Sequence, residues 1–360
     1  MSLTPKTPIP EGAIRFNTDS SKMEVWIGDK WMQGAVSSPD LGDSTAGARG
    51  LIMGGNSPGA PNSGRVNNIE YVTITSAGNA TDFGDLTGNG RSDLGSCASA
   101  TRGLAMGGFD ENAPGYINIM DFVTFSSTGN ASDFGDLIVR RQPPACFSNA
   151  TRGCCAGGYI IASLTPLYSS NQGVNIIDFI TMTSAGNAVD FGDMTNGYRN
   201  KDSCQSPTRG ILAGGYNSPG DDTNVIEFVV TATTGNAVDF GDSVAGKNGW
   251  GQNGYGSATR GVFPLSSGGL GNYVHDSLNY ITLSTLGNTT EYGDLTTNRN
   301  LACSFSNPTR GILVGGNNPA ADDIDYHNIA TGGKAVDFGE YSAYSQLNAS
   351  AGCSNAHGGL

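Results

Sequence analysis

The feature that most constrains the fold of this chain is an internal repeat of roughly fifty residues. A short apolar segment that opens with Arg-Gly, usually preceded by Thr, occurs six times in the 360 residues. Four of the five intervals between copies are 50 to 53 residues long and the third is 57. A period of this length is typical of proteins built from repeated units that bury their cores against one another. The arginines of the six copies are Arg49, Arg102, Arg152, Arg209, Arg260 and Arg310.

Two distances inside the repeat never change. Each copy carries an aromatic residue after a polar, mostly acidic one, then a Gly seven residues later and an acid eleven residues later. In the second copy these are Phe122, Gly129 and Asp133, the last opening the sequence Asp-Phe-Gly-Asp. The interval from Arg to the aromatic, in contrast, varies from 16 to 27 residues. Length variation is therefore concentrated in one loop, which indicates a closed architecture whose strands must stay in register with their neighbours.

Each copy consists of four short segments with the character of β-strands. In the second copy they are SDLGSCAS, RGLAMGG, INIMDFVTF and ASDFGDL, rich in alternating Val, Ile, Thr and aromatic residues and without a helical period. The 54 glycines, about twice the average share, suit tight turns with positive φ angles. We predict an all-β protein, a β-propeller of four-stranded blades, with a solenoid as the alternative.

The two ends of the chain decide the number of blades. Residues 13–34 indicate a β-hairpin, and Cys353, Asn355 and Ala356 resemble the inner strand of a further copy. We predict seven blades, the last completed jointly by 13–34 and 345–360, because this removes exposed edges. Six blades with an appended hairpin are the alternative. The predicted organisation is an arm at 1–12 and one propeller domain at 13–360, with repeats beginning near 41, 93, 143, 200, 251 and 301.

Charge and composition exclude several classes of protein. A formal net charge of −13 without basic clusters disfavours nucleic-acid binding. No run of 18 apolar residues is present, so no membrane insertion is expected, and the N-terminus lacks the apolar region of a secretion signal.

The seven cysteines have a regular arrangement. Five of them each precede a repeat boundary by a few residues. We therefore expect these five to be buried and too far apart to form disulfides, which indicates that the protein assembles in a reducing compartment. Of the adjacent pair Cys154 and Cys155, only one is expected to face inward, because side chains alternate along a strand. The five are Cys97, Cys146, Cys204, Cys303 and Cys353.

The sequence predicts neither an enzyme nor a cofactor. The sequence Asp-Phe-Gly, which is also a metal-binding motif of protein kinases, recurs in copies of the repeat, and the other kinase motifs are missing. We therefore interpret it as a structural turn and strand rather than as a catalytic element. The only asymmetric cluster of reactive residues is Tyr273, His275 and Asp276, in the most divergent copy. No metal-ligand spacing is complete, either for zinc or for calcium, so no metal site is predicted. The recurrent arginines are expected to pair with the recurrent acids across blades, with a ligand role around a central channel as the alternative.

The repeats resemble those of known proteins. Over residues 41–360 the order of Gly-Gly, aromatic strand and outer strand resembles kelch-type blades. The pair GNATDFGDL (78–86) and TRGLAMGG (101–108) is similar to repeats in virion structural proteins of marine tailed phages, especially cyanophages. The hairpin GAIRFNTDSSKMEVW is similar to segments of phage tail-fibre proteins. The resemblance implies a virion component made in a bacterial host cytoplasm, and it carries over no catalytic residue.

The expected function is therefore that of a phage virion protein. It is either a host-binding fibre tip or knob, recognising cell-surface polysaccharide or a virion partner, or a capsid or tail decoration with a structural role. A propeller-type, glycan-active enzyme is the second alternative. Its partners would be other virion proteins and the host polysaccharide.

Recognition is expected in the loops after Gly-Gly, which emerge on one face of a propeller. Aromatic rings offer flat apolar contacts to a saccharide, and carboxylates accept hydrogen bonds from its hydroxyls. The alternative is that these loops are surface insertions without a binding role, which would vary in the same way. The loops are 56–67, 109–117, 159–174, 216–223, 266–278 and 317–324. The candidate ligand-binding residues are Tyr116, Tyr159, Tyr168, Tyr216, Tyr273, His275, Asp276, Asp322 and Asp323.

Overall fold

The computed structural model shows an all-β chain that divides into two compact units, 1–42 and 43–360. Within the described residues the helical turns are η1 (Asn62–Gly64) and η2 (Ala162–Leu164), and no helix is long and apolar enough to cross a membrane. The described residues are 10–17, 22–33, 48–60, 62–111, 115–165, 168, 170–217, 223–243, 254–264, 275–317, 319 and 321–356.

The first unit is a three-stranded antiparallel sheet. Strands β1 (Ile14–Asn17), β2 (Lys22–Ile27) and β3 (Lys30–Gln33) pair in that order. Arg15 forms an ion pair with Glu24 on the neighbouring strand. The predicted hairpin is thus present and is extended by a third strand.

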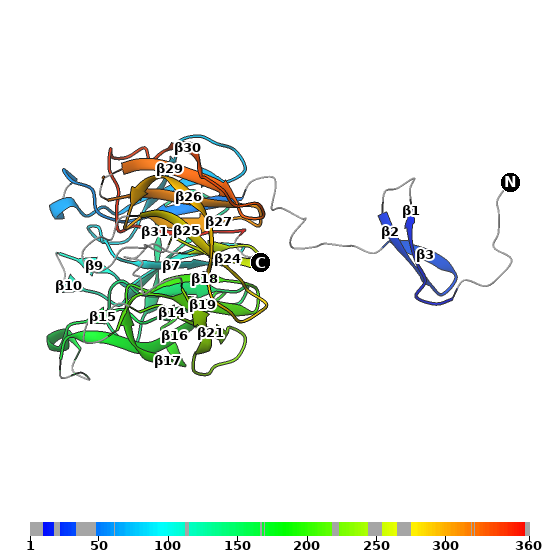
Figure 1. Ribbon diagram of the computed structural model, residues 1–360, viewed down its shortest axis with the longest axis horizontal. Helices are drawn as coiled ribbons and strands as arrows, with labels where there is room; N and C mark the ends of the chain where they lie inside the picture. Colours follow the sequence, from blue (N-terminus) through cyan, green and yellow to red (C-terminus); the bar gives the residue numbers. More distant parts are fainter. Residues whose placement is uncertain are drawn as a thin grey trace. The chain divides into compact units, whose positions relative to one another are not determined.

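Within the described residues the second unit contains six antiparallel sheets built on four strands each, and a further two-stranded sheet formed by loop strands. The six sheets are numbered in chain order and given from inner to outer strand (Figure 1). Sheet 1 is β31 (Ala351–Ser354), β4 (Arg49–Met53), β5 (Asn68–Thr73) and β6 (Thr81–Asp85). Sheet 2 is β7 (Gly95–Ala98), β8 (Arg102–Met106), β11 (Ile119–Thr124) and β12 (Ser132–Asp136). Sheet 3 is β13 (Ala145–Ser148), β14 (Arg152–Ala156), β16 (Gln172–Thr181) and β17 (Val189–Arg199).

The other three sheets repeat the pattern. Sheet 4 is β18 (Asp202–Gln205), β19 (Arg209–Ala213), β21 (Val225–Val230) and β22 (Val238–Asp242). Sheet 5 is β23 (Tyr255–Gly256), β24 (Arg260–Phe263), β25 (His275–Thr282) and β26 (Thr290–Arg299). Sheet 6 is β27 (Cys303–Ser306), β28 (Arg310–Gly316), β29 (Ala321–Asn328) and β30 (Val336–Glu340). Four short strands lie in the loops after Gly-Gly: β9 (Phe109–Asp110), β10 (Gly115–Tyr116), β15 (Tyr159–Ile160) and β20 (Tyr216–Asn217).

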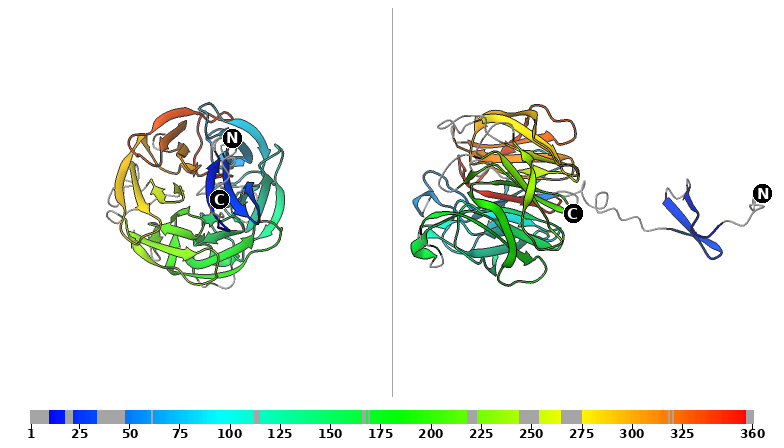
Figure 2. Two further views of the ribbon diagram at one scale, coloured as in Figure 1. Left: turned by 90° about the vertical axis from the view of Figure 1, so that its right-hand side faces the viewer. Right: turned by 60° about the horizontal axis from the view of Figure 1, so that its bottom comes forward.

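The inner strands of the six sheets contact one another in a closed cycle. Each of β31, β7, β13, β18, β23 and β27 contacts the next, and β27 contacts β31. The sheets accordingly follow one another around a common centre (Figure 2). We refer to this arrangement as the six-sheet ring.

The predicted seventh blade is not present among the described residues, and the assignment of both termini to it is corrected. Strand β31 is an inner strand, as its sequence suggested, but it pairs with β4 of the first copy, from Ala351 opposite Met53 to Ser354 opposite Gly50. The strands of 13–34 pair with one another. Pairing β31 with β4 supplies the inner edge of sheet 1 and closes the ring without a further sheet.

Backbone hydrogen bonds at and next to the invariant Gly of the repeat hold neighbouring sheets together. The backbone amide of Gly129 donates to the carbonyl of Phe83, and that of Ala131 donates to Asp85. The same bond runs from sheet to sheet and returns from Gly78 to Phe338. A Cβ on Gly84 would lie 2.4 Å from the carbonyl oxygen of Gly129, which explains why glycine occupies the third position of Asp-Phe-Gly-Asp.

The six repeated arginines also bind the next sheet, although not through acids as predicted. Arg102 Nη1 donates to the carbonyl of Met182 at 3.0 Å, and its guanidinium lies 4.9 Å from the ring centre of Phe122. The last arginine, Arg310, donates to Ile74 and so completes the cycle. Backbone carbonyls and aromatic faces are suitable partners for a guanidinium. The equivalent donors are Arg49, Arg152, Arg209 and Arg260.

The acids before the repeated aromatics pair with a different set of cations. In four sheets a basic residue from the segment leading to the inner strand forms a buried ion pair with this acid. In sheet 1 the acid Glu70 instead accepts a hydrogen bond from the hydroxyl of Ser342. The ion pairs are Arg91–Asp121, Arg141–Asp178, Lys201–Glu227 and Arg299–Asp325.

All seven cysteines are buried and free, so the predicted burial is confirmed. Their registers differ, however, because only Cys97, Cys204 and Cys353 lie opposite the middle of the Arg-Gly strand. Cys154 and Cys155 alternate across their strand, since they pack in different apolar clusters. The expectation that only one of them faces the core is nevertheless wrong: both are buried, because each sheet packs on both faces. Burial raises the pKa of Cys97 and Cys353, which disfavours the reactive thiolate.

One histidine interrupts the apolar packing between sheets 5 and 6. The residue paired with the Arg-Gly glycine is Val or Ile in sheets 1 to 5, and it is His327 in sheet 6. The hydroxyl of Tyr255 lies 2.7 Å from His327 Nε2, and both side chains are buried. Burial lowers the pKa of His327 to about 4 from 6.5.

We expect His327 to weaken the ring as the pH falls. Its native pKa lies below that of the unfolded chain, so between pH 6.5 and about 4 the unfolded state binds the extra proton. The free energy of unfolding should then decrease with falling pH by up to about 1.4 kcal/mol per unit relative to a variant without the histidine. The measurement is urea denaturation of the wild type and of Tyr255→Phe/His327→Val at pH 7.5, 6 and 5. Parallel pH profiles for the two proteins would contradict this assignment.

Candidate functional site

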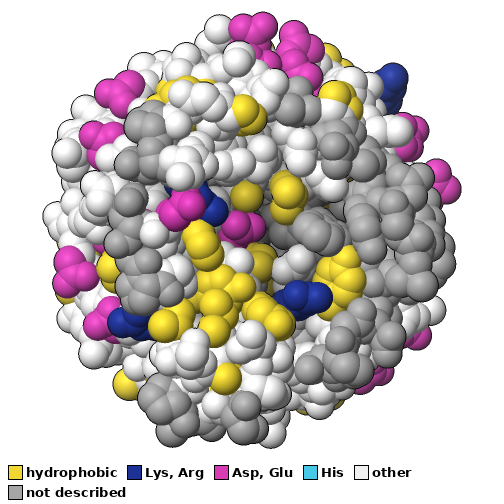
Figure 3. All heavy atoms as spheres, turned by 90° about the vertical axis from the view of Figure 1, so that its left-hand side faces the viewer, with side chains coloured by type: hydrophobic (Ala, Val, Ile, Leu, Met, Phe, Trp, Pro, Cys, Tyr) yellow, Lys and Arg dark blue, Asp and Glu magenta, His cyan; other side chains and the backbone are white. Residues whose placement is uncertain are grey.

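A cavity of about 400 Å³ opens on the side of the ring that carries the loops after Gly-Gly. Strands β9, β10 and β15 lie along this side (Figure 1). Seen from there, the centre of the ring is hollowed, and hydrophobic side chains gather in the hollow beside basic and acidic ones (Figure 3). We name it the loop-face cavity, and its lining residues are Asp93, Tyr116, Gln142, Pro143, Tyr159, Arg199, Asn200, Tyr216 and Leu301.

Two kinds of segment build this cavity. The tyrosines stand in the loops after Gly-Gly of sheets 2, 3 and 4, and most of the other lining residues stand in the segments that lead into inner strands. Short bridges join the two kinds, pairing Gln142 with Tyr159 and Arg199 with Tyr216. Asp93 and Asn200 have left-handed φ angles of 55° and 56°, a conformation that Asp and Asn tolerate better than most residues. Backbone pairing with the segments before the inner strands therefore fixes the loops that carry Tyr159 and Tyr216.

Aromatic rings and a guanidinium form a continuous series of contacts beside the cavity. The Arg199 guanidinium lies 4.9 Å from the ring centre of Tyr159 and 5.1 Å from that of Tyr216. Tyr159 meets Tyr116 edge to face, with ring centres 6.3 Å apart, and Tyr116 meets Phe109 at 5.8 Å. Residues of three sheets thus present aromatic surface to one space.

The polar groups of the cavity differ in their electrostatic state. Asp93 accepts a hydrogen bond from the hydroxyl of Ser92 at 2.9 Å, and burial raises the pKa of its carboxyl group. Burial also raises the pKa of Tyr116. Gln142 Oε1 is buried and accepts no hydrogen bond from the part of the chain that the structure describes. None of the ion pairs within that part involves Arg199.

The structure brings together three of the nine predicted site residues. Tyr116, Tyr159 and Tyr216 line the cavity. Tyr168 instead packs against a small apolar cluster that contains Val139 and Ile160, so it has a structural role.

Of the remaining predicted residues, Asp276, Asp322 and Asp323 are described and do not line this cavity. Tyr273 lies outside the described residues, and the side chain of His275, the first residue of β25, is not described. Asp276 follows it in β25. Asp322 and Asp323 lie in β29 rather than in a loop, which corrects the predicted loop 317–324, because pairing with β28 extends to Ala321.

Sequence reasoning missed Arg199, Gln142 and Asp93. They belong to the segment between one outer strand and the next inner strand, whose length barely varies, so length variation did not mark it. Its chemistry does vary, with Ser92, Gln142, Arg199 and Asn300 at positions that bridge to the loops after Gly-Gly. That variation was the available signal.

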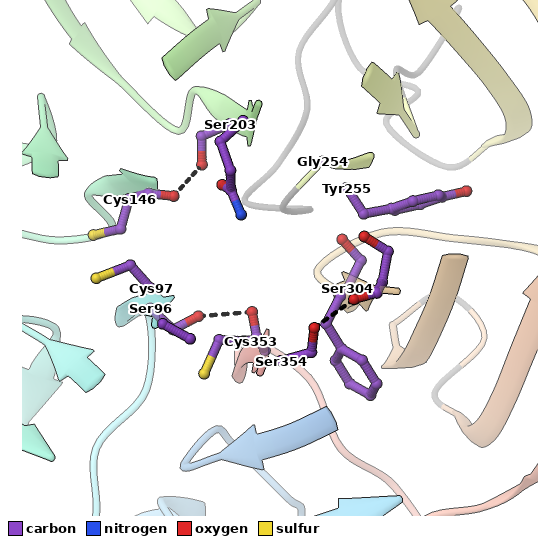
Figure 4. A pocket seen from close by; sticks show the side chains of 14 residues that line it. Ser96, Cys97, Cys146, Ser203, Gly254, Tyr255, Ser304, Cys353 and Ser354 are labelled. Atoms are coloured by element: carbon purple, nitrogen blue, oxygen red, sulfur yellow. Dashed lines mark hydrogen bonds between the residues drawn. The ribbon is translucent and has the colours of Figure 1, made fainter. Parts of the chain in front are cut away.

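A second, much smaller space lies at the centre of the ring, between the inner strands. Its volume is about 30 Å³, on the order of one water molecule. Small side chains such as Ser96 and Ser203 surround it, and their hydroxyls donate to the backbone carbonyls of Gly352 and Cys146 on neighbouring inner strands (Figure 4). These bonds tie adjacent inner strands together and leave no room for an organic ligand.

Comparison with known proteins adds no identification. The chain matches no known family, and no curated protein matches it.

Among the described residues there is no group of three or more His, Cys, Asp or Glu side chains that could hold a metal ion.

Proposed function

We propose that the six-sheet ring is a six-bladed, kelch-like β-propeller that binds cell-surface polysaccharide in the loop-face cavity, as the host-recognising part of a tailed-phage virion. The observation that carries the proposal is the convergence of Tyr116, Tyr159 and Tyr216, from three sheets, on one cavity with Arg199.

The size and lining of the cavity support a saccharide ligand. Its volume of about 400 Å³ falls within the range of roughly 300–1,000 Å³ typical of small-molecule sites. Tyrosine rings offer apolar faces to a pyranose ring, while Gln142, Asn200 and Asp93 offer polar groups to hydroxyls.

The same lining favours a binding protein over a glycan-active enzyme. Glycoside hydrolysis generally requires two carboxyl groups that flank the scissile bond. Asp93 is the one carboxyl group among the described residues that line the cavity, and those residues include no His, Ser, Cys or Lys. The pair of carboxyl groups that most glycosidases use is therefore not found among them.

The virion assignment rests on the resemblance of the repeats GNATDFGDL and TRGLAMGG to virion structural proteins. A net charge of −13 agrees with partners other than nucleic acid. Other virion proteins would be the attachment partners. A decoration with a purely structural role is the alternative, and it would bind purified particles but no saccharide.

A matched pair of variants tests the saccharide site. Tyr159→Ala should lower affinity for the bound polysaccharide about tenfold, because it removes a stacked ring from the cavity wall, while the Tm changes little. Tyr168→Ala should do the opposite, lowering the Tm through lost packing while binding is retained. Binding is measured on an array of bacterial capsular and cell-wall polysaccharides and then by calorimetry. Retention of purified virions with no polysaccharide bound would favour the decoration alternative.

A further inference from the structure

We infer that the loop-face cavity selects an acidic saccharide, and that Arg199 receives the carboxylate or sulfate group of that sugar. This inference rests on the proposed function and specifies its ligand class.

The position of Arg199 suits it to bind an anion. It is the last residue of β17 and pairs with Tyr216 of β20, so its backbone is held by a strand pair. Its guanidinium lies against the rings of both Tyr159 and Tyr216. A guanidinium that packs against aromatic rings can still direct the N–H groups in its plane toward a carboxylate or sulfate, which it binds with two hydrogen bonds.

The buried cations of the ring show what is unusual about Arg199, which is itself half-buried. Arg91, Arg141 and Arg299 each contact an aspartate, and Lys201 contacts a glutamate. Within the described residues Arg199 lines a cavity without such a partner, in a chain that has 32 acids and only 19 Lys and Arg. A partly desolvated cation is stabilised when it meets an opposite charge. A ligand anion would give the half-buried Arg199 the kind of partner that the protein itself gives to its buried cations.

Asp93 is compatible with an anionic ligand. It is the one acid among the described residues that line the cavity, and burial raises the pKa of its carboxyl group. A raised pKa means that this environment disfavours the charged carboxylate, the form that would repel an anion. Arg199 is the one cation among the described lining residues, so it supplies the attraction for an anion.

The test uses the full chain and an array that carries carboxylated, sulfated and neutral polysaccharides. We expect the affinity of the wild type for acidic polysaccharides to exceed that for neutral ones by at least about tenfold. This ratio is what one charge-assisted hydrogen bond contributes. Arg199→Gln should abolish that preference, and Arg199→Lys should restore only part of it, since lysine keeps the charge but not the bidentate geometry. The matched control is Lys334→Gln, which removes one positive charge from an exposed turn at the opposite end of β29 from the loops.

The outcomes separate this inference from the proposed function. Preference for carboxylated or for sulfated members identifies which acid group is bound, and either supports the inference if Arg199→Gln removes it. Equal binding of acidic and neutral polysaccharides, or an unchanged preference in Arg199→Gln, overturns the inference; a loss in Tyr159→Ala would still support saccharide binding. Absence of binding to every member overturns both.

Discussion

Deletion of residues 351–360 should abolish cooperative unfolding of the six-sheet ring. The deletion removes β31, which pairs with β4 and contacts both β27 and β7, so sheet 1 loses its inner strand and the ring opens. Ala351 and Cys353 are buried in the contact between sheets 1 and 2. The loss should be comparable to the whole stability of a typical domain, about 5–15 kcal/mol, and should expose the edge of β4. Calorimetry and circular dichroism melts measure it.

The control for this experiment is deletion of residues 1–42. Because this segment forms a compact unit of its own, its removal should leave the main thermal transition within a few degrees of the full chain. A C-terminal deletion that melts like the full chain would show that β31 is dispensable and that the ring closes in another way. An equally large loss from the N-terminal deletion would revive the seven-blade interpretation.

The second large effect is expected at the buried ion pair of sheet 3. Arg141 and Asp178 both have fully buried side chains, with Arg141 Nη2 2.8 Å from Asp178 Oδ2. Arg141→Met should destabilise the ring by about 3–5 kcal/mol, because it leaves an uncompensated carboxylate in the interior. Burial already raises the pKa of Asp178 against the opposing effect of Arg141. Urea denaturation at pH 7 gives the free energy of unfolding.

Two further variants make that experiment specific. Arg140→Met changes the adjacent, partly exposed arginine and should alter stability by less than about 0.5 kcal/mol. The double variant Arg141→Met/Asp178→Leu should recover most of the loss, since it removes both charges together. A single variant that costs less than about 1 kcal/mol, or a double variant that costs more than the single, would contradict the role assigned to this pair.

Much of the fold could be predicted from the sequence because the repeat marks which positions are constrained. The spacing of Phe122, Gly129 and Asp133, kept in all six copies, indicated strands held in fixed register. The second sheet follows the predicted strands closely, from β7 to β12. Alignment of the six copies likewise predicted the buried cysteines and the inner strand near the C-terminus.

The sequence by itself determined the β character of the chain, the four strands of a repeat and the side on which variable loops gather. Three of the site tyrosines were found through that loop variation. What the repeat could not identify was the partner of each constrained side chain. A recurring arginine and a recurring acid look like a pair in any alignment of copies, whereas Arg102 reaches a carbonyl of the next sheet and Asp121 reaches Arg91.

Only the tertiary structure decided how the ring closes and where its cations face a cavity. Residues 351–354 lie some 300 positions from β4, and no local pattern distinguishes pairing with the first copy from the start of a seventh. Arg199 likewise becomes a candidate ligand-binding residue only because the ring brings Tyr159 of sheet 3 and Tyr216 of sheet 4 close to its guanidinium. Periodicity in a sequence reports the environment that every copy shares, while contacts between different copies depend on how many copies close the ring and in what order they meet.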